Sequence, residues 1–114
     1  MAVTPKCIIE PSLLTASSAT YYTAPAGTIT IIDKMTLVNT SATLFIAVTI
    51  YFVPSGVTPS GSHVVLKAFT LSPNETYEVA KIEGHVLNTG DFIQAFAGTT
   101  NLISFRVSGR EVVV

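Results

Sequence analysis

The side chains that could carry out chemistry are few and scattered along the chain. Two histidines, His63 and His85, could bind a metal ion together with Glu83 or Asp91, but no H-x-H or H-E-x-x-H spacing is present. Polar residues at strand ends explain the histidines more simply. The single cysteine, Cys7, excludes an intrachain disulfide, and its flanks favour a small buried side chain over a reactive thiol. We therefore expect no metal and no cofactor.

Patterns typical of enzymes are also missing from the sequence. Glu75 and Glu78 are close together, but their odd spacing directs them to opposite faces of a strand. Ser55, Ser60 and Ser62 lie among proline and glycine residues without the G-x-S-x-G pattern of a nucleophilic serine. No phosphate-binding G-x-x-x-x-G-K-[ST] loop is present. We expect a protein that is not an enzyme.

The composition points to a chain whose surface is poorly charged. Of 114 residues, 48% are hydrophobic and only 11% are charged, against about 25% charged in a typical soluble domain. Two explanations remain open: neighbouring subunits cover much of the surface, or threonine and serine hydroxyls solvate it. The net charge is −1 and the six basic residues form no cluster, so we expect no nucleic-acid partner.

The sequence predicts no membrane association. The start of the chain, Met1–Lys6, lacks the basic and apolar regions of a signal peptide. The uncharged run from Ala42 to Val53 is shorter than the roughly 20 residues that a membrane-spanning helix needs. We expect a soluble protein made in the cytoplasm.

The secondary-structure elements that the sequence predicts are β-strands. Thr28–Thr40 alternates apolar and polar residues, which predicts a half-buried strand with Ile29, Ile31, Met35 and Leu37 on one face. Asp33 and Lys34 interrupt the apolar face, which predicts either a bulge or a short connection there. The segment Lys34–Pro54 then reads as a central hairpin that turns at Asn39–Ser41. Its second strand is predicted to fill the core with one face, through Leu44, Ile46, Val48, Ile50 and Phe52.

The whole chain contains eight or nine such short strands, separated by turn signals. This pattern predicts an all-β domain, a two-sheet antiparallel sandwich of jelly-roll or immunoglobulin-like type. Residues 1–11 are expected to form an N-terminal arm or edge strand, since Pro11 cannot donate to a ladder. Residues 12–114 are expected to form the sandwich.

Several residues are candidates for contacts with a partner. Two Pro-Ser-Gly units enclose a loop with fixed corners, which exposes Ser55, Val57 and Ser60, although it could equally be a spacer. The second face of the strand in Ala42–Val53 offers Phe45 and Tyr51. Adjacent residues of a strand face opposite sides, so one ring of Tyr21 and Tyr22 should be exposed, either at a subunit contact or as a platform for a glycan.

The order of the strand and turn signatures resembles a known group of proteins. The signatures are Tyr21–Thr28, Leu37–Ser41, Val48–Gly56, Leu71–Thr76, Leu87–Asp91 and Val107–Gly109. Over Thr20–Glu111 the chain is similar to small β-sandwich virion proteins of tailed bacteriophages, and most similar to capsid decoration (cement) proteins.

The resemblance implies a structural role and no catalytic residues. It implies a protein located in the virion that braces shell subunits in many copies, with the major capsid protein or other virion proteins as partners. A homo-oligomer, either a dimer or a trimer, is expected. A tail, fibre or adaptor component is the alternative within the same class, and a glycan-binding sandwich module is the alternative from another class.

Overall fold

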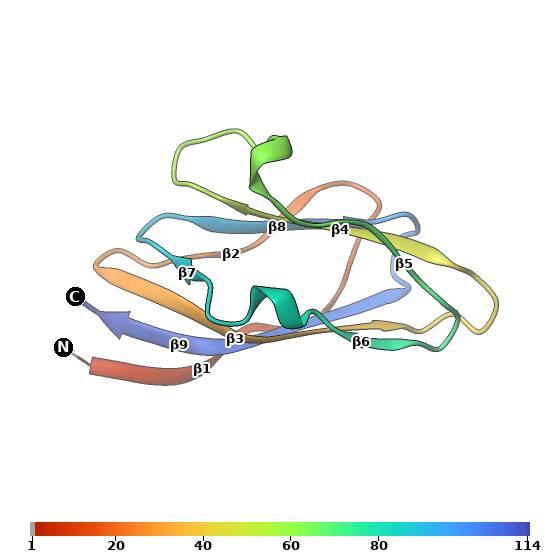
Figure 1. Ribbon diagram of the computed structural model, residues 1–114, viewed down its shortest axis with the longest axis horizontal. Coiled ribbons are helices and arrows are strands. Elements are labelled where there is room, and N and C mark those ends of the chain that lie inside the picture. The colour runs from red at the N-terminus through yellow and green to blue at the C-terminus, as the bar shows by residue number, and fades with distance from the viewer. Residues whose placement is uncertain (1) are drawn as a thin grey trace.

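The computed structural model describes residues 2–114, which form nine strands and two short 3-10 helices. The strands and helices have these bounds: β1 Ala2–Leu13, β2 Ala19–Thr23, β3 Thr28–Asn39, β4 Ile46–Val53, η1 Gly61–His63, β5 Val64–Leu71, β6 Thr76–Glu78, η2 Ala80–Ile82, β7 Val86–Leu87, β8 Phe92–Ala97 and β9 Ile103–Val113. Figure 1 shows them as two layers along a molecule of 47 × 27 × 21 Å.

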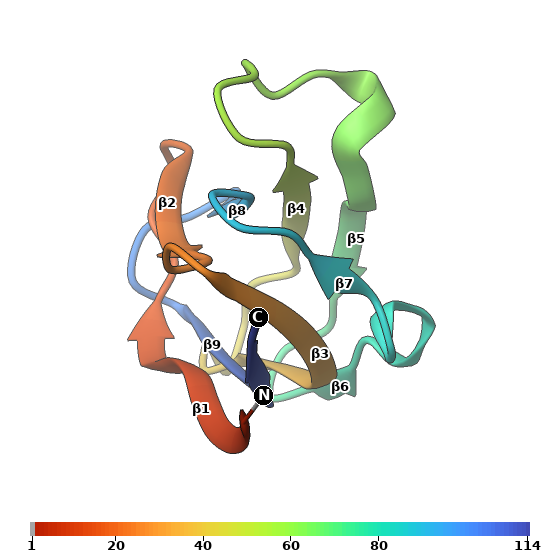
Figure 2. The same ribbon diagram turned by 90° about the vertical axis from the view of Figure 1, so that its left-hand side faces the viewer.

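Both layers are antiparallel sheets, as predicted. The first sheet has the order β1-β9-β3-β6, with β7 also paired to β3, and the second sheet has the order β2-β8-β4-β5 (Figure 2). If β6 and β7 are taken as one interrupted strand, the first four strands pair in turn with the last four in reverse order. This is the topology of a jelly roll, which decides between the two predicted sandwich types.

The predicted central hairpin is wrong, because its two halves lie in different sheets. β3 pairs with β9, β6 and β7, whereas β4 pairs with β5 and β8. The chain crosses from one sheet to the other between Asn39 and Ile46. Leu44, predicted to lie in the core, is on this crossover and is exposed.

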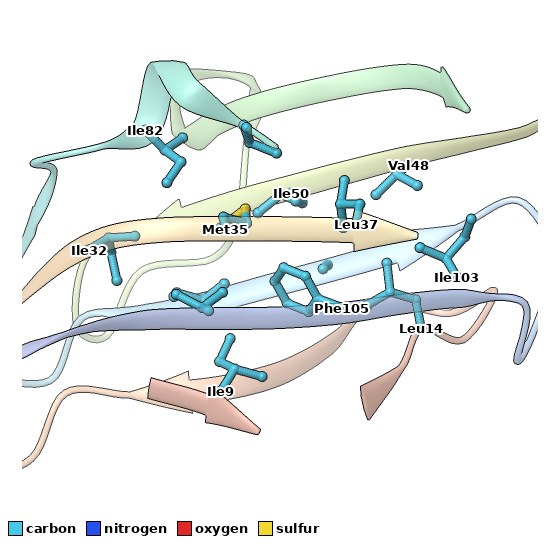
Figure 3. Packing of buried hydrophobic residues seen from close by; sticks show 14 of the residues in the cluster. Ile9, Leu14, Ile32, Met35, Leu37, Val48, Ile50, Ile82, Ile103 and Phe105 are labelled. Carbon is cyan, nitrogen blue, oxygen red and sulfur yellow. The ribbon is translucent and has the colours of Figure 1, made fainter. Parts of the chain in front are cut away.

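The core fills the space between the sheets with aliphatic side chains around one phenylalanine (Figure 3). Ile46, Val48 and Ile50 of β4 face it, as the alternation predicted, while Phe52 packs at its margin. Phe105 of β9 is fully buried in it. At about 25 cal/mol per Å² of apolar surface, this core is the main source of the free energy of folding.

A bulge at Asp33 changes which residues of β3 point toward the core. The register with β9 shifts between Ile32 and Lys34, as the sequence predicted. Met35 is buried on the inner face, but Ile29 and Ile31 are half-buried, which corrects the prediction that all lie on one face. The extra residue reverses the alternation, so that Thr28, Thr30 and Ile32 face inward in the first half.

β1 is an edge strand paired to β9 along its length, and it continues past residue 11 to Leu13. From Ala2 it is an ordered strand rather than a loose arm; Met1 lies outside the described residues. Two register shifts interrupt the pairing after Cys7, and Pro5 and Pro11 lie on this edge. Proline is tolerated there because the outer side of an edge strand has no ladder partner.

Candidate contact surface

The strands of the two sheets differ sharply in charge. Those of the first sheet carry Lys6, Glu10, Asp33, Lys34, Glu78, Arg106, Arg110 and Glu111. In the second sheet, β2, β4 and β8 carry no charged residue, and β5 carries only Lys67. The shortage of charge in the composition is therefore concentrated in one layer of the molecule.

The outer side of the second sheet is the strongest candidate for a contact surface. Inward residues of β4 and β8 belong to the core cluster, so strand alternation turns the other residues outward. We call this surface the β4–β8 face; it consists of Ala47, Thr49, Tyr51, Val53, Phe92, Gln94 and Phe96. Thr49 and Val53 are themselves buried, at 6% and 1% exposure, and the other five are half-buried. The rings of Tyr51 and Phe96 lie side by side on it, with centroids 6.3 Å apart and planes tilted by 30°.

Two polar side chains of the β4–β8 face have partners within the chain. The Thr49 hydroxyl oxygen accepts a hydrogen bond from the Ala68 N–H (3.0 Å), at a bulge in β5 where Ala68 has a φ of 47°. The Gln94 side-chain amide donates to the Thr20 hydroxyl oxygen (3.1 Å). Each side chain has further hydrogen-bonding capacity, the Thr49 O–H and the second Gln94 amide N–H, so a partner that covered them would have to offer acceptors.

The loop Pro54–His63 rises above the outer side of the second sheet at the end where β4 stops (Figure 1). The backbone N–H of Ser55 donates to the Asp91 carboxylate (3.0 Å), which fixes the base of the loop. The backbone N–H of Ser60 donates to His63 Nδ1 (3.1 Å), which closes η1. Val57 is exposed between these fixed points. The structure thus places Ser55, Val57 and Ser60 on the same side of the molecule as Tyr51.

Phe45 lies away from this group, on the crossover that leads into β4, and is 69% exposed. The crossover is held from inside by Asn39, which is fully buried. The Asn39 side-chain amide donates to the carbonyl oxygens of Leu44 (2.8 Å) and Leu71 (3.2 Å), and its oxygen accepts from the Ser41 N–H (3.0 Å). The crossover that carries the exposed Phe45 side chain is therefore fixed by the hydrogen bonds of Asn39.

Tyr21 and Tyr22 both pack against the core, so the prediction that one ring is exposed is wrong. A register shift between Thr20 and Tyr22 breaks the alternation of β2 and turns both rings inward. The Tyr21 ring meets Phe105 edge-on, with centroids 5.7 Å apart. Neither tyrosine is part of the β4–β8 face.

The Tyr22 hydroxyl joins the two sheets at one end of the sandwich. It donates to the Glu111 carboxylate (2.6 Å) and lies 2.7 Å from the hydroxyl of buried Thr30. Burial, together with the hydrogen bond to Glu111, raises the pKa of Tyr22 to about 12. Lys6 pairs with the same carboxylate at 3.3 Å. This polar network links β2 of the second sheet to three strands of the first, β1, β3 and β9.

Sequence reasoning missed Phe92, Gln94 and Phe96 as surface residues. The alternation Phe-Ile-Gln-Ala-Phe-Ala indicated such a surface, because large residues at every second position of a strand all lie on the same face of the sheet. Sequence alone left open which face was inside. Burial of Ile93, Ala95 and Ala97 decides it, since the smaller residues fit against the core.

No other kind of site emerges from residues 2–114. His85 packs edge-on against Phe52 and His63 closes η1, and no group of three or more possible metal ligands forms in this part of the chain. Among the same residues, no helix is long and apolar enough to cross a membrane.

Comparison with known proteins gives a likeness of fold. No family model matches the sequence, and no curated protein matches it at a significant level. A chain from the endospore appendages of Bacillus, described as disulfide-linked pili, superimposes with a TM-score of 0.56 at 10% identity, over 98% of this chain and 88% of that one.

Chains of infectious bursal disease virus give a similar result. One from the T13 particle has a TM-score of 0.57 at 7% identity, and one from the Gt strain has 0.51 at 12%. Each match covers 96% of this chain but only 30% and 32% of the viral chains. This chain therefore spans about a third of the length of those viral chains, and at such identities the likeness concerns the fold.

Proposed function

We propose that this chain is a structural protein of a virus particle, and more specifically a decoration (cement) protein that stabilises the capsid of a tailed bacteriophage. The observation that carries the proposal is the β4–β8 face, which has three aromatic rings and no charged residue on a chain whose other sheet is well charged. Such a face is poorly solvated when free and suits coverage by protein. No catalytic role is assigned to any residue.

Two further observations support the proposal. The signatures in Thr20–Glu111 resemble those of phage decoration proteins, and the jelly roll is shared with chains of a virus particle and of a pilus, both of which are assemblies. A subunit that binds only the assembled shell lowers the free energy of that state by mass action. Many weak contacts acting together then brace the shell.

The proposal is tested by adding the purified protein to phage capsids that lack it. We expect co-sedimentation with the capsids and a higher capsid melting temperature. Tyr51→Glu, which places a charge on the β4–β8 face, should weaken binding at least about 10-fold, because a buried unpaired charge is costly. Arg106→Glu, an exposed change on the first sheet, is the matched control. Capsids that neither bind the protein nor gain stability would refute the role.

A tail, fibre or adaptor component uses the same kind of surface and differs in location. Electron microscopy of particles carrying a labelled copy of the chain distinguishes the two positions. Label along the capsid surface agrees with decoration, whereas label at the tail or at the capsid–tail junction agrees with the alternative.

Glycan binding is a second candidate, which the paired rings of Tyr51 and Phe96 favour. An uncharged aromatic platform can stack against the apolar face of a neutral sugar, and the Gln94 amide lies in the same surface. A glycan array tests this function, with Tyr51→Ala expected to abolish binding and Tyr21→Ala, on the inner side, expected to affect it only through stability. An array without hits removes this candidate.

A further inference from the structure

The far end of the loop Pro54–His63 is closed by two hydrogen bonds between the same two residues. The His63 backbone N–H donates to the Ser60 carbonyl oxygen (3.0 Å), and the Ser60 backbone N–H donates to His63 Nδ1 (3.1 Å). This is the geometry of a capping box, with an imidazole nitrogen in the position usually taken by a glutamate or glutamine oxygen. An imidazole differs from those groups because it changes its charge between pH 5 and pH 8.

The second of these bonds requires one form of the His63 ring. Nδ1 accepts the Ser60 N–H only when it carries no proton, so the ring must be neutral with its proton on Nε2. A doubly protonated imidazole donates from both nitrogens and accepts at neither. Protonation of the ring and closure of the loop by this bond therefore exclude each other.

The one other hydrogen-bonding group beside Nδ1 is a poor substitute for the lost bond. The Ser60 hydroxyl oxygen lies 3.4 Å from Nδ1, which is long for a hydrogen bond. The same hydroxyl is already 3.1 Å from the hydroxyl of Ser62. The Ser60 N–H is exposed, so once the ring turns away it is satisfied by water and the closed turn is no longer held.

The titratable groups on the neighbouring elements supply no opposite charge at the ring. β4, which packs against η1, carries Tyr51 alone, and β5, which continues from His63, carries Lys67 alone. The loop has no other titratable side chain, and Asp91 lies at its base, where it accepts from the Ser55 N–H. Within residues 2–114 no carboxylate forms an ion pair with His63. Protonation thus removes a hydrogen bond without creating a salt bridge in its place.

Opening would release one end of the loop and keep the other fixed. The Asp91 carboxylate holds the base through the Ser55 N–H, and this bond does not involve His63. The released part contains Val57, which is exposed. Because the loop rises above the outer side of the second sheet (Figures 1 and 2), its opening changes the surface next to the β4–β8 face.

From these observations we propose that His63 makes the closure of the loop Pro54–His63 depend on pH, so that mild acid opens the loop and weakens binding of a partner at this side of the molecule. A histidine ring in water takes up its second proton at about pH 6.5, so the closed loop prevails at pH 7.5 and the open loop at pH 5.5. The effect on binding rests on the proposed function, whereas the opening of the loop does not.

Backbone ¹⁵N relaxation at the two pH values measures the opening. Order parameters of residues 57–62 should fall from about 0.85 at pH 7.5 to below about 0.6 at pH 5.5. Carboxylic acids in general stay ionised over this range, which leaves histidine as the responding group. The ¹⁵N signals of the His63 ring report the tautomer, and the proton is expected on Nε2 at pH 7.5.

Two substitutions of His63 fix the loop in its two states. His63→Gln keeps an oxygen that accepts the Ser60 N–H and has no proton to gain, so the loop should stay closed at both pH values. His63→Ala removes the acceptor, so the loop should be open at both. His85→Gln is the matched control, because it replaces the other histidine, which packs against Phe52, and should leave the response to pH unchanged.

The results for the loop decide the first half of the proposal. A fall in the order parameters of the wild type that is absent from His63→Gln supports it. A wild-type loop that is equally rigid at both pH values, an equal response in His63→Gln, or a proton on Nδ1 at pH 7.5 overturns it.

Capsid binding is scored separately at the same two pH values. The dissociation constant of the wild type should rise about 5-fold in acid, as expected for the loss of one hydrogen bond, and that of His63→Gln should stay the same. An unchanged wild-type constant despite an open loop overturns this inference and retains the proposed function. A loop that opens in acid on a protein that binds no capsid at either pH refutes the proposed function and retains the pH dependence of the loop.

Discussion

At the residue scale, single polar side chains supply hydrogen bonds to backbone groups that bulges leave without a partner in the sheet. The bulge in β5 leaves the Ala68 N–H without a ladder partner, and the Thr49 hydroxyl supplies one at 3.0 Å. Thr49 is 6% exposed, but Ala68 is exposed and the bond is part-buried, so water can replace the hydroxyl only in part. A buried donor that loses its acceptor costs about 1–3 kcal/mol.

Replacing this hydroxyl should therefore destabilise the protein. We expect Thr49→Val to lower the free energy of unfolding by about 1–2 kcal/mol in urea denaturation, because the side chain keeps its shape but the Ala68 N–H loses its acceptor. Ala68→Gly should leave stability unchanged or raise it by up to ~1 kcal/mol, since glycine adopts a positive φ without strain. A Thr49→Val protein as stable as wild type would show that the bond contributes nothing.

Gly109 is required because β9 approaches β3 closely there. A Cβ atom at this position would stand 2.2 Å from the carbonyl oxygen of Ile31 and 3.0 Å from the Ile8 side chain. Backbone cannot move aside cheaply, so Gly109→Ala should cost about 3 kcal/mol or more, measured by thermal or urea unfolding. Gly61→Ala, where the added atom meets open space, is the control and should change stability by less than about 0.5 kcal/mol.

At the element scale, the crossover between β3 and β4 determines which strands become neighbours. Asn39 holds it through three hydrogen bonds, to Leu44, Leu71 and Ser41. Asn39→Asp removes the two donors and places a charge among carbonyl oxygens. We expect a loss of about 3 kcal/mol or more in the free energy of unfolding.

The same chemical change on the surface provides the comparison for Asn39. Asn74 is exposed in the turn between β5 and β6, with no side-chain hydrogen bond among those described. Asn74 has a φ of 61°, which aspartate also tolerates, so Asn74→Asp should change stability by less than about 1 kcal/mol. Equal effects of the two substitutions would contradict the assignment of Asn39 as the support of the corner.

At the scale of the whole molecule, Tyr22 links the two sheets and makes stability depend on alkaline pH. Its pKa is raised to about 12 in the folded state, mainly by burial, against an ordinary value of 10.0. The contribution of this group is therefore fully present below pH 10 and is lost as pH rises toward 12. The free energy of unfolding should fall more steeply over this range in wild type than in Tyr22→Phe.

Tyr22→Phe should also be less stable at neutral pH, by about 1–3 kcal/mol, because buried Thr30 loses its partner. Urea denaturation at a series of pH values measures both effects. Tyr51→Phe, on the outer side of the second sheet, controls for the general loss of a tyrosine hydroxyl. Parallel pH profiles for wild type and Tyr22→Phe would contradict the link.

The fold class and much of the strand pattern of this protein can be predicted from its amino-acid sequence. Alternating apolar residues and closely spaced turn signals identified an all-β sandwich, and Asp33 marked a bulge that is present. The apolar face of β4 was also correct for Ile46, Val48 and Ile50. These features depend on local periodicity and turn chemistry, which are readable along the chain.

The partners of the strands, and the faces that point outward, depend on contacts between segments that are distant in the sequence. Sequence placed β3 and β4 in one hairpin, but their residues pair with strands far away in the chain, because pairing depends on burial shared between distant segments. Bulges at Asp33 and in β2 reverse the alternation, which a period of two cannot reveal. The β4–β8 face therefore became visible only when Phe92 and Phe96 of β8 were found next to Tyr51 and Val53 of β4.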